Sequence, residues 1–461
     1  MHNLSKRNNT INMTEGPLFG KILIFSLPLM ASSILQLIYN AADVIVVGRF
    51  AGESALAAVG STGSLINLIL NLFIGLSTGA SVCASNAIGA RDDNRVKRYV
   101  NTSMAISIIG GIFAMLLGLL LARPMLSLMK TPQSVLDDAT LYMQVYFLGV
   151  PASLVFNFAA GLLRASGDTK RPLYILSLSG IVNVLLNLFL VIVCHFGVAG
   201  VAIATSVSQY ISTFLIIMYM RKLDSSLRYT LKETKIHKKE LIDVIRIGIP
   251  SGMSGVMFNI SNMIIQSSIN IFGEIVIAGN TAAANIEGFI YTAMNTVYQA
   301  SQTFTGQNLG AGKIKRINKV LVNSLLIVNC IGVTMCVLAL VFKQPLLGLY
   351  VTGDNVDAVI DAGIARMTVI CSTYYLCGMM DVVCGSLRGM KYSFSIMIIS
   401  LLGACAFRII WLSTVFKANQ TVFNIYVSYP ISWILTLSAF LVYYVYGYRR
   451  IKKRAEQNLP I

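Results

Sequence analysis

Residues 22–47 read ILIFSLPLMASSILQLIYNAADVIVV, an apolar stretch long enough to cross a bilayer as one α-helix. A hydrocarbon layer about 30 Å thick takes about 20 apolar residues in a helix. Similar runs recur along the chain of 461 residues, of which 56% are hydrophobic and 12% are charged. Since about a quarter of the residues in a soluble domain are charged, the sequence predicts an all-α membrane protein.

The apolar runs predict twelve transmembrane helices. They lie near residues 22–47, 56–87, 101–122, 141–163, 172–194, 198–220, 244–271, 280–307, 320–342, 362–386, 394–416 and 422–447. With the N-terminus in the cytoplasm, 29 of the 36 Lys and Arg residues fall on the cytoplasmic side and five on the outer side. Because cytoplasmic loops are rich in Lys and Arg, we expect both termini in the cytoplasm. The same bias explains the net charge of +17, so we expect no nucleic-acid partner.

The two halves of the sequence repeat with a nearly constant offset. The matched residues, 221 to 224 positions apart, are Pro28 and Pro250, Asn40 and Asn262, Arg95 and Arg316, Pro124 and Pro345, and Arg164 and Arg388. Such an offset indicates duplication. We therefore expect two pseudo-symmetric six-helix bundles related by an axis along the membrane normal. They are an N-lobe at 1–220 and a C-lobe at 244–447, joined by a linker at 221–243 and followed by a basic tail at 448–461.

Polar side chains line one face of the first span. Gln36, Tyr39, Asn40 and Asp43 are spaced at i, i+3, i+4 and i+7. Polar groups within a span are costly unless they face a bundle interior or a wet cavity, so we expect this face in a substrate cavity, with Asp43 binding a cation. The alternative is that Asp43 is solvated at the outer interface. Pro28 removes a backbone hydrogen bond and predicts a bend in this span.

The fifth span carries a second polar stripe, formed by Ser179, Asn183 and Asn187 at i, i+4 and i+8. This stripe is typical of hydrogen bonding between helices or of a ligand site. Thr205 adds a hydroxyl in the sixth span.

In the second half, span 8 carries Glu287, Tyr291 and Tyr298 near one face, and span 10 carries Asp381. Asp381 lies seven residues before Arg388 as Asn157 lies seven before Arg164, so the two positions are equivalent, but only the second half has a carboxylate there. The alternative is that Asp381 forms a structural ion pair with Arg408 of span 11. The charges within spans are mainly acidic, namely Asp43, Glu287 and Asp381 against Arg408 and Arg366. Acidic groups in a cavity attract protons, Na⁺ or organic cations.

Other classes of protein find little support. The eight cysteines form no CxxC motif, and the three histidines lie far apart in the tail or in loops. The chain has neither an HExxH nor a GxSxG motif, so no enzyme activity is expected.

Several motifs together resemble the multidrug and toxic compound extrusion (MATE) family of the MOP superfamily. They are the first span from Leu27-Pro28 to Gly48, Ala57-Ala58-Val59-Gly60, GLLRASGDTK at 161–170, GVAGVAIAT at 197–205 and GQNLGAG at 306–312. The resemblance covers residues 18–447.

The resemblance implies two six-helix lobes around a central cavity, alternating access, and export of amphipathic or cationic compounds in exchange for H⁺ or Na⁺, without a further cofactor. It also implies a cation-coupling site in the N-lobe, for which Asp43, Asn183 and Thr205 match. Asn187 stands where similar members have Asp. If Na⁺ is the coupling ion, Asp43 and Asn183 are its expected ligands. Glu287 and Asp381 resemble acidic residues of the family's C-lobe.

The sequence therefore predicts a multidrug efflux antiporter in the plasma membrane, which in a bacterium is the inner membrane. We expect a monomer in the lipid bilayer with small-molecule drugs as substrates and no obligate protein partner. The alternative is a lipid-linked oligosaccharide flippase of the same superfamily, which would be expected to have several basic residues in its cavity.

Overall fold

The computed structural model describes residues 10–129, 131–351 and 355–457. Lys6, Arg7 and Lys130, which entered the predicted charge bias, and residues 458–461 of the predicted tail lie outside these ranges. Helices make up almost all of the described residues, and no strand is found among them. The all-α architecture predicted from the sequence is confirmed.

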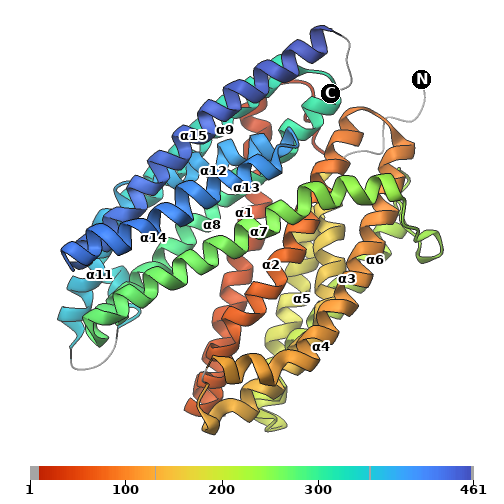
Figure 1. Ribbon diagram of the computed structural model, residues 1–461. Coiled ribbons are helices and arrows are strands. Elements are labelled where there is room, and N and C mark those ends of the chain that lie inside the picture. The colour runs from red at the N-terminus through yellow and green to blue at the C-terminus, as the bar shows by residue number, and fades with distance from the viewer. Residues whose placement is uncertain (1–9, 130, 352–354, 458–461) are drawn as a thin grey trace. The chain divides into compact units, whose positions relative to one another are not determined.

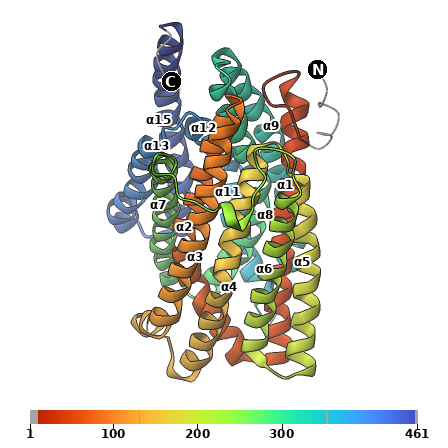
Figure 2. The ribbon, with the colours of Figure 1, turned by 90° about the vertical axis from the view of Figure 1, so that its right-hand side faces the viewer.

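The chain forms two compact units, which are here called unit 1 and unit 2. Unit 1 contains Ala31–Gly252 and the segment that ends at Asn12. Its elements are α1 (Leu18–Val46) from Ala31 onward, η1 (Val47–Ala51), α2 (Glu53–Gly89), α3 (Asp93–Leu128), α4 (Gln133–Ala165), α5 (Lys170–Leu188), η2 (Phe189–Val193), α6 (Gly197–Arg221), η3 (Leu231–Glu233) and α7 (Lys238–Ile269) as far as Gly252. The helices α2, α3, α4 and α6 run side by side in this unit (Figure 2).

Unit 2 contains Met13–Met30 and Met253–Ile461. After the remainder of α7 it comprises η4 (Asn270–Phe272), α8 (Glu274–Gly310), α9 (Ile314–Val341), α10 (Lys343–Gly348), α11 (Val356–Cys371), α12 (Tyr374–Gly389), α13 (Ser393–Ser400), η5 (Leu401–Ala406), α14 (Phe407–Trp411), η6 (Leu412–Phe416) and α15 (Val422–Glu456) (Figure 1). The segments η1, η2, η5 and η6 are single π-helical turns. The turns η1 and η2 end the helices that begin with α1 and α5, η5 lies between α13 and α14, and η6 follows α14.

The helices α1 and α7 each belong to both units. The chain passes from unit 2 to unit 1 between Met30 and Ala31, two residues after Pro28, and it passes back between Gly252 and Met253, two residues after Pro250. The predicted lobes at 1–220 and 244–447 instead divide the chain at the linker. Pro28 lies inside α1, which continues through it as one helix, so the bend at this position stays a prediction.

Ten helices within the described parts of the chain are long and apolar enough to cross a membrane. The pair α11 and α12, bent by 46° at Ser372 and Thr373, makes an eleventh span when it is taken as one. The helix α8 is long enough, with 37 residues, but it is not apolar enough to count as such a span, because polar side chains such as Asn280, Glu287 and Gln299 lower its mean hydropathy. The predicted number of twelve spans therefore stays a prediction, whereas a chain with many spanning helices is confirmed.

The backbone carries the offset of the sequence repeat. Gly52 (φ 91°) and Gly273 (φ 87°) precede α2 and α8 with the same left-handed conformation, which suits glycine because it has no Cβ. At the turn after each of these helices, Arg91 (φ 56°) and Gly312 (φ 68°) are again left-handed. Both pairs are 221 residues apart. The duplication therefore extends from the side chains to the turns.

The core of unit 1 is built around α4, which packs against α2, α3 and α6. Phe147, Val150 and Phe158 on this helix are completely buried. By contrast, Leu120 on α3 is 73% exposed and Val442 on α15 is 74% exposed. Exposed aliphatic side chains on such helices are typical of a surface that faces lipid.

Candidate functional site

A polar cluster lies where α1, α5 and α6 meet in unit 1. The Nδ2 atom of Asn187 donates a hydrogen bond to Oδ1 of Asp43 over 2.5 Å. The Thr205 hydroxyl lies beside the same carboxylate, and Asn183 Nδ2 donates to Thr205 Oγ1 over 3.5 Å. The structure thus brings together the four residues that the sequence singled out for cation coupling, although their role in coupling stays a prediction.

Two amide oxygens in this cluster lack hydrogen-bond partners. Asn187 is completely buried and Asn183 is 5% exposed, and the Oδ1 atoms of both are unpaired. Leaving a buried acceptor unsatisfied costs about 1–3 kcal/mol. No Lys or Arg forms an ion pair with Asp43 among the residues that the structure describes. The cluster therefore presents a carboxylate, two amide oxygens and a hydroxyl without a compensating cation.

These oxygens suit a hard monovalent cation better than a transition metal. Alkali and alkaline-earth ions prefer carboxylate, carbonyl and hydroxyl oxygens. Within the described ranges no group of three His, Cys, Asp or Glu side chains is arranged to hold a metal ion. A Na⁺ ion among these oxygens could be bound by both unpaired amide oxygens, whereas a proton on Asp43 would give one of them a hydrogen-bond donor.

Tyrosines surround the cluster. The Tyr39 hydroxyl donates to the carbonyl oxygen of Ser177 over 3.2 Å, and its ring packs so closely on Gly180 that a Cβ there would overlap it. On α4, the rings of Tyr142 and Tyr146 lie 6.2 Å apart. Aromatic faces of this kind can attract organic cations.

The other predicted residues of unit 1 lie apart from this network. Gln36 and Asn40 are exposed on α1. The Asn157 amide donates to the carbonyl oxygen of Ser153 in its own helix over 2.8 Å. No hydrogen bond within the described chain joins these three side chains to Asp43.

In unit 2 the buried carboxylate of Glu287 is bound by an arginine. Arg366 donates from Nε to Oε1 of Glu287 over 2.9 Å and from Nη2 to Oε2 over 2.6 Å. Its Nη1 donates to Oδ1 of Asn280 over 2.7 Å. Glu287 is 4% exposed and Arg366 is 7% exposed. Two parallel charge-assisted bonds fix the geometry of this pair and neutralise both charges.

Asp381 and Arg408 do not form the ion pair that was the alternative from the sequence. Arg408 donates from Nε to Ser432 Oγ over 3.0 Å, and its guanidinium lies 4.4 Å from the centre of the Tyr429 ring. Asp381 instead lies beside Tyr291, and its Oδ2 atom has no hydrogen-bond partner. Within the described chain no ion pair joins Asp381 to a cation, which corrects that alternative.

The predicted tyrosines of unit 2 form a polar ladder on α8. The Tyr291 hydroxyl accepts a hydrogen bond from Asn295 Nδ2 over 3.4 Å, and Tyr298 is bonded to Arg388 of α12. Tyr291 is 39% exposed.

The ion pair of Glu287 with Arg366 and the hydrogen bond from Arg366 to Asn280 were not predicted from the sequence. Both charges were placed within predicted spans, but no sequence pattern indicated that they form an ion pair. The signal that could have found the pair is the presence of one acid and one base in spans 8 and 10 of the same half, since a buried charge is stable only when it is paired.

Comparison with known proteins identifies relatives over almost the whole chain. The family model described as MatE matches residues 28–189 and 250–414. The chain is 25% identical over 436 residues to "Probable multidrug resistance protein YpnP" of Bacillus subtilis, which covers 95% of this chain and 97% of that protein. It is 27% identical over 337 residues to "Probable multidrug resistance protein YoeA" of the same organism, covering 71% of this chain and 73% of that one.

Solved structures show the same fold. A MOP superfamily transporter from Pyrococcus furiosus superimposes with a TM-score of 0.88 at 22% identity, covering 97% of this chain and 99% of that one. The outward-facing form of a multidrug resistance MATE family transporter gives a TM-score of 0.87 at 22% identity, covering 96% of this chain and 99% of that one. The chain therefore has the same fold as these two proteins.

Proposed function

The chain belongs to the MatE family of membrane transporters, and on this premise we propose that it is a secondary multidrug exporter driven by an inward flow of H⁺ or Na⁺. Relatives that match most of its length are named as multidrug resistance proteins, and the family consists of transporters rather than enzymes. The proposal places the chain in the plasma membrane as a monomer with both termini in the cytoplasm.

The observation that carries the coupling proposal is the uncompensated oxygen cluster of unit 1. Asp43 has amide and hydroxyl neighbours but no ion-pair partner within the described chain, and the Oδ1 atoms of Asn183 and Asn187 are unpaired. A proton or Na⁺ would satisfy groups that otherwise remain costly. The C-lobe acid Glu287 cannot serve in the same way while Arg366 holds both of its oxygens.

Coupling requires that the ion binds one conformation better than the other, because a ligand with equal affinity for both states shifts no equilibrium. We propose that the cation occupies the Asp43 cluster in one state and that the cationic drug displaces it, directly or through α1, in the other. Linkage then makes drug release and ion binding favour each other, since a coupling free energy acts equally on both ligands.

The proposed substrates are amphipathic cations. The aromatic surroundings of Asp43, formed by Tyr39, Tyr142 and Tyr146, suit cation–π contact. In unit 2, Asp381 with its unpaired Oδ2 and the polar ladder of Tyr291 and Tyr298 are proposed as a separate group of drug contacts. Gln36, Asn40 and Asn157 are proposed as further drug contacts.

The flippase alternative gains no support from the arrangement of basic residues. A pyrophosphate headgroup would need several free cations in the cavity. Arg366 is held by Glu287 and Asn280, and Arg408 is 3% exposed and bound to Ser432. The relatives YpnP and YoeA are also named as probable multidrug resistance proteins.

The test is efflux of a fluorescent organic cation from vesicles that contain the purified protein, with Na⁺ and pH gradients imposed separately. We expect one gradient to drive efflux and Asp43→Asn to reduce the driven rate at least about tenfold, which corresponds to the 1–3 kcal/mol typical of coupling. Asp137→Asn is the matched control, because Asp137 is an exposed carboxylate of the same unit, paired only with Arg123.

Gradient-driven efflux that persists in Asp43→Asn at the wild-type rate would refute the coupling role. Efflux that needs neither gradient would refute antiport altogether. Asp137→Asn should match the wild type in both assays.

A further inference from the structure

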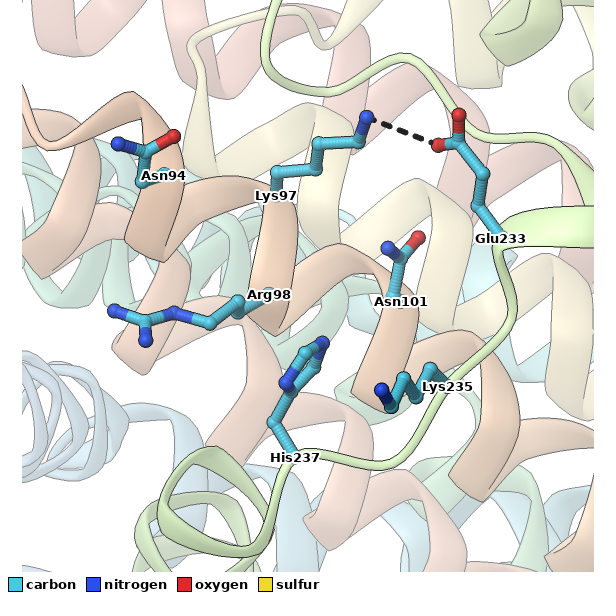
Figure 3. Close-up of a pocket in the computed structure, with 7 residues that line it drawn as sticks. All are labelled: Asn94, Lys97, Arg98, Asn101, Glu233, Lys235 and His237. Atoms are coloured by element: carbon cyan, nitrogen blue, oxygen red, sulfur yellow. Dashed lines mark ion pairs between the residues drawn. The ribbon is translucent and has the colours of Figure 1, made fainter.

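A basic pocket lies in unit 1, away from the Asp43 cluster, where the linker crosses the first turns of α3. Its volume is about 650 Å³. Figure 3 shows that α3 contributes Asn94, Lys97, Arg98 and Asn101, and that the linker and its junction with α7 contribute Glu233, Lys235 and His237. Because α3 begins at Asp93 and is a candidate span, the pocket lies at the end of that span that is predicted to face the cytoplasm.

The lining has more positive than negative charge. Lys97, Arg98 and Lys235 stand against the single carboxylate of Glu233. Lys97 Nζ lies 3.1 Å from that carboxylate, with both side chains about half exposed, so the pair is weak and screened by water. The exposed side chain of Lys235 has no hydrogen-bond or ion-pair partner among the described residues. The pocket therefore offers cationic groups that remain available to an anion.

Behind these charges lies a buried acceptor without a partner. Asn101 is 6% exposed and lines the pocket, and its Oδ1 atom accepts no hydrogen bond. An unsatisfied buried carbonyl needs a donor, which a bare phosphate ion does not supply well. A ligand that carries both a phosphate and a hydroxyl group would satisfy the cations and the amide together.

The wall of the pocket is fixed rather than loose. The His237 backbone N–H donates to Thr102 Oγ1 over 3.1 Å, which ties the linker to α3. Arg98 Nε lies 3.1 Å from Oε1 of Glu240, whose side chain is 3% exposed. In the linker, the ring of Tyr229 is completely buried and its hydroxyl shares a hydrogen bond with Thr234 Oγ1 at 2.6 Å. A prearranged site binds at a lower entropic cost.

Two apolar side chains flank the pocket on the same linker. Leu231 is 61% exposed and Ile236 is 43% exposed, although both are large aliphatic residues. In α7, which follows the linker, Ile242 and Ile245 are also exposed, at 53% and 37%. Aliphatic side chains next to a basic cluster are typical of a segment that lies on a lipid surface.

We propose that this pocket binds the phosphate and the neighbouring hydroxyl of a glycerol-phosphate group, supplied by the headgroup of phosphatidylglycerol in the adjacent leaflet. Lys97 and Lys235 hold the phosphate, while Arg98 stays paired with Glu240. Asn101 accepts from the glycerol hydroxyl, and Leu231 and Ile236 contact the acyl region. Soluble glycerol phosphate offers the same chemistry without the acyl chains. The site is independent of the ion and drug sites proposed above.

The test is a binding titration of the full-length protein in a neutral detergent with dihexanoyl-phosphatidylglycerol. The parallel arms use dihexanoyl-phosphatidylcholine, glycerol 1-phosphate and inorganic phosphate. We expect the phosphatidylglycerol probe to bind most tightly, and Lys235→Ala to weaken it about fivefold, the usual effect of one basic residue near an anionic lipid. The matched control is Lys232→Ala, because Lys232 is an exposed lysine of the same linker that does not line the pocket.

Each remaining outcome decides between the ligands. An equal loss in Lys232→Ala and Lys235→Ala, or equal binding of phosphatidylcholine, would overturn the pocket. Equally tight binding of glycerol 1-phosphate would overturn the lipid as the source and leave the soluble ester as the ligand.

Asn101→Leu should remove the preference for phosphatidylglycerol over dihexanoyl-phosphatidic acid, which lacks the glycerol hydroxyls. An unchanged preference would refute the role of Asn101.

Discussion

In unit 1 the carboxylate of Asp43 is surrounded by amides and a hydroxyl, whereas in unit 2 the carboxylate of Glu287 is clamped by the guanidinium of Arg366. Both lie in a duplicated framework, yet neither has an acidic counterpart. At the offset of 222 residues that relates Asn40 to Asn262, Asp43 corresponds to Ile265 and Glu287 to Leu65, both buried aliphatic residues. The backbone was duplicated, but these two carboxylates are each specific to one half.

This difference separates two uses of a buried acid. A carboxylate with an arginine partner is neutral as a pair and stable only while the partner remains, so its contribution is structural. A carboxylate among uncharged oxygens has to acquire a proton or a metal ion from outside. The comparison therefore favours the proposed ion exchange at Asp43 and a fixed polar anchor at Glu287.

The largest expected effect is on the stability of unit 2. Glu287→Gln leaves the guanidinium of Arg366 buried without its carboxylate, which should lower the free energy of unfolding by about 3–5 kcal/mol. Asp43→Asn removes no ion pair and should change it by less than about 1 kcal/mol. The measurement is denaturant unfolding of the purified protein in mixed micelles, together with the yield after extraction.

A double variant keeps this prediction testable if Glu287→Gln cannot be purified. Glu287→Gln combined with Arg366→Gln removes both charges and should recover much of the lost stability, as neutral replacements of buried ion pairs often do. A loss in Asp43→Asn as large as that in Glu287→Gln would show that both acids are structural and would remove the contrast between the units.

The next effect concerns the affinity for the coupling ion. Asn187→Leu removes the donor to Asp43 and one of the two unpaired amide oxygens. A hydrogen bond to a charged group contributes about 1.5–3 kcal/mol and here stabilises the ion-free carboxylate. If H⁺ is the coupling ion, the proton concentration for half-maximal efflux should therefore fall at least about tenfold. The vesicle efflux assay at a series of Na⁺ concentrations and pH values measures it.

Asn71→Leu is the control for this variant, since the Asn71 amide donates only to the carbonyl oxygen of Asn67 in its own helix. We expect its half-maximal concentration to stay within a factor of two of the wild type. If Asn187→Leu behaved like Asn71→Leu, the bond between Asn187 and Asp43 would be mere packing between helices, as the alternative from the sequence had it.

Helical spacing predicted the two stripes that meet in unit 1, and the resemblance to the MATE family brought them together in one site, whereas neither predicted the pair of unit 2. The stripes on α1 and α5 repeat every three or four residues, so their members share a face whichever helices are neighbours. The pair of Glu287 and Arg366 joins two helices 79 residues apart, and spacing within one helix carries no information about such a contact. Family resemblance added Thr205, which lacks a stripe of its own.

Hydropathy located the helices and missed their interruptions. The predicted span at 362–386 is two helices, α11 and α12, that meet at Ser372 and Thr373 without a proline to mark the break. The π turns η1 and η2 are equally invisible, because their composition is that of ordinary apolar helix. The first part of α1 belongs to unit 2 and the first part of α7 belongs to unit 1. This division depends on which helices these segments pack against, and no local sequence pattern predicts that.

The smallest expected effect concerns the packing of the α7 segment within unit 1 and of the α1 segment within unit 2. In unit 1, α7 approaches α2 so closely that a Cβ at Gly79 would lie 2.5 Å from the carbonyl oxygen of Val244 and 2.8 Å from the backbone nitrogen of Gly248. In unit 2, the first part of α1 is held by side chains, with Phe25 edge-on to Phe304 at 5.6 Å between ring centroids. Backbone contact cannot yield to an added methyl, whereas side chains can repack.

We therefore expect Gly79→Ala to lower the free energy of unfolding by about 1–3 kcal/mol and Phe25→Leu by less than about 1.5 kcal/mol. The micelle unfolding measurement compares the two variants directly. Gly60→Ala is the control on α2, because a Cβ at Gly60 has no atom within 4 Å and should leave stability unchanged or slightly raised. If Gly79→Ala were as well tolerated as Gly60→Ala, α7 would have room to shift against α2. The rigid contact of unit 1 would then be no firmer than the aromatic contact of unit 2.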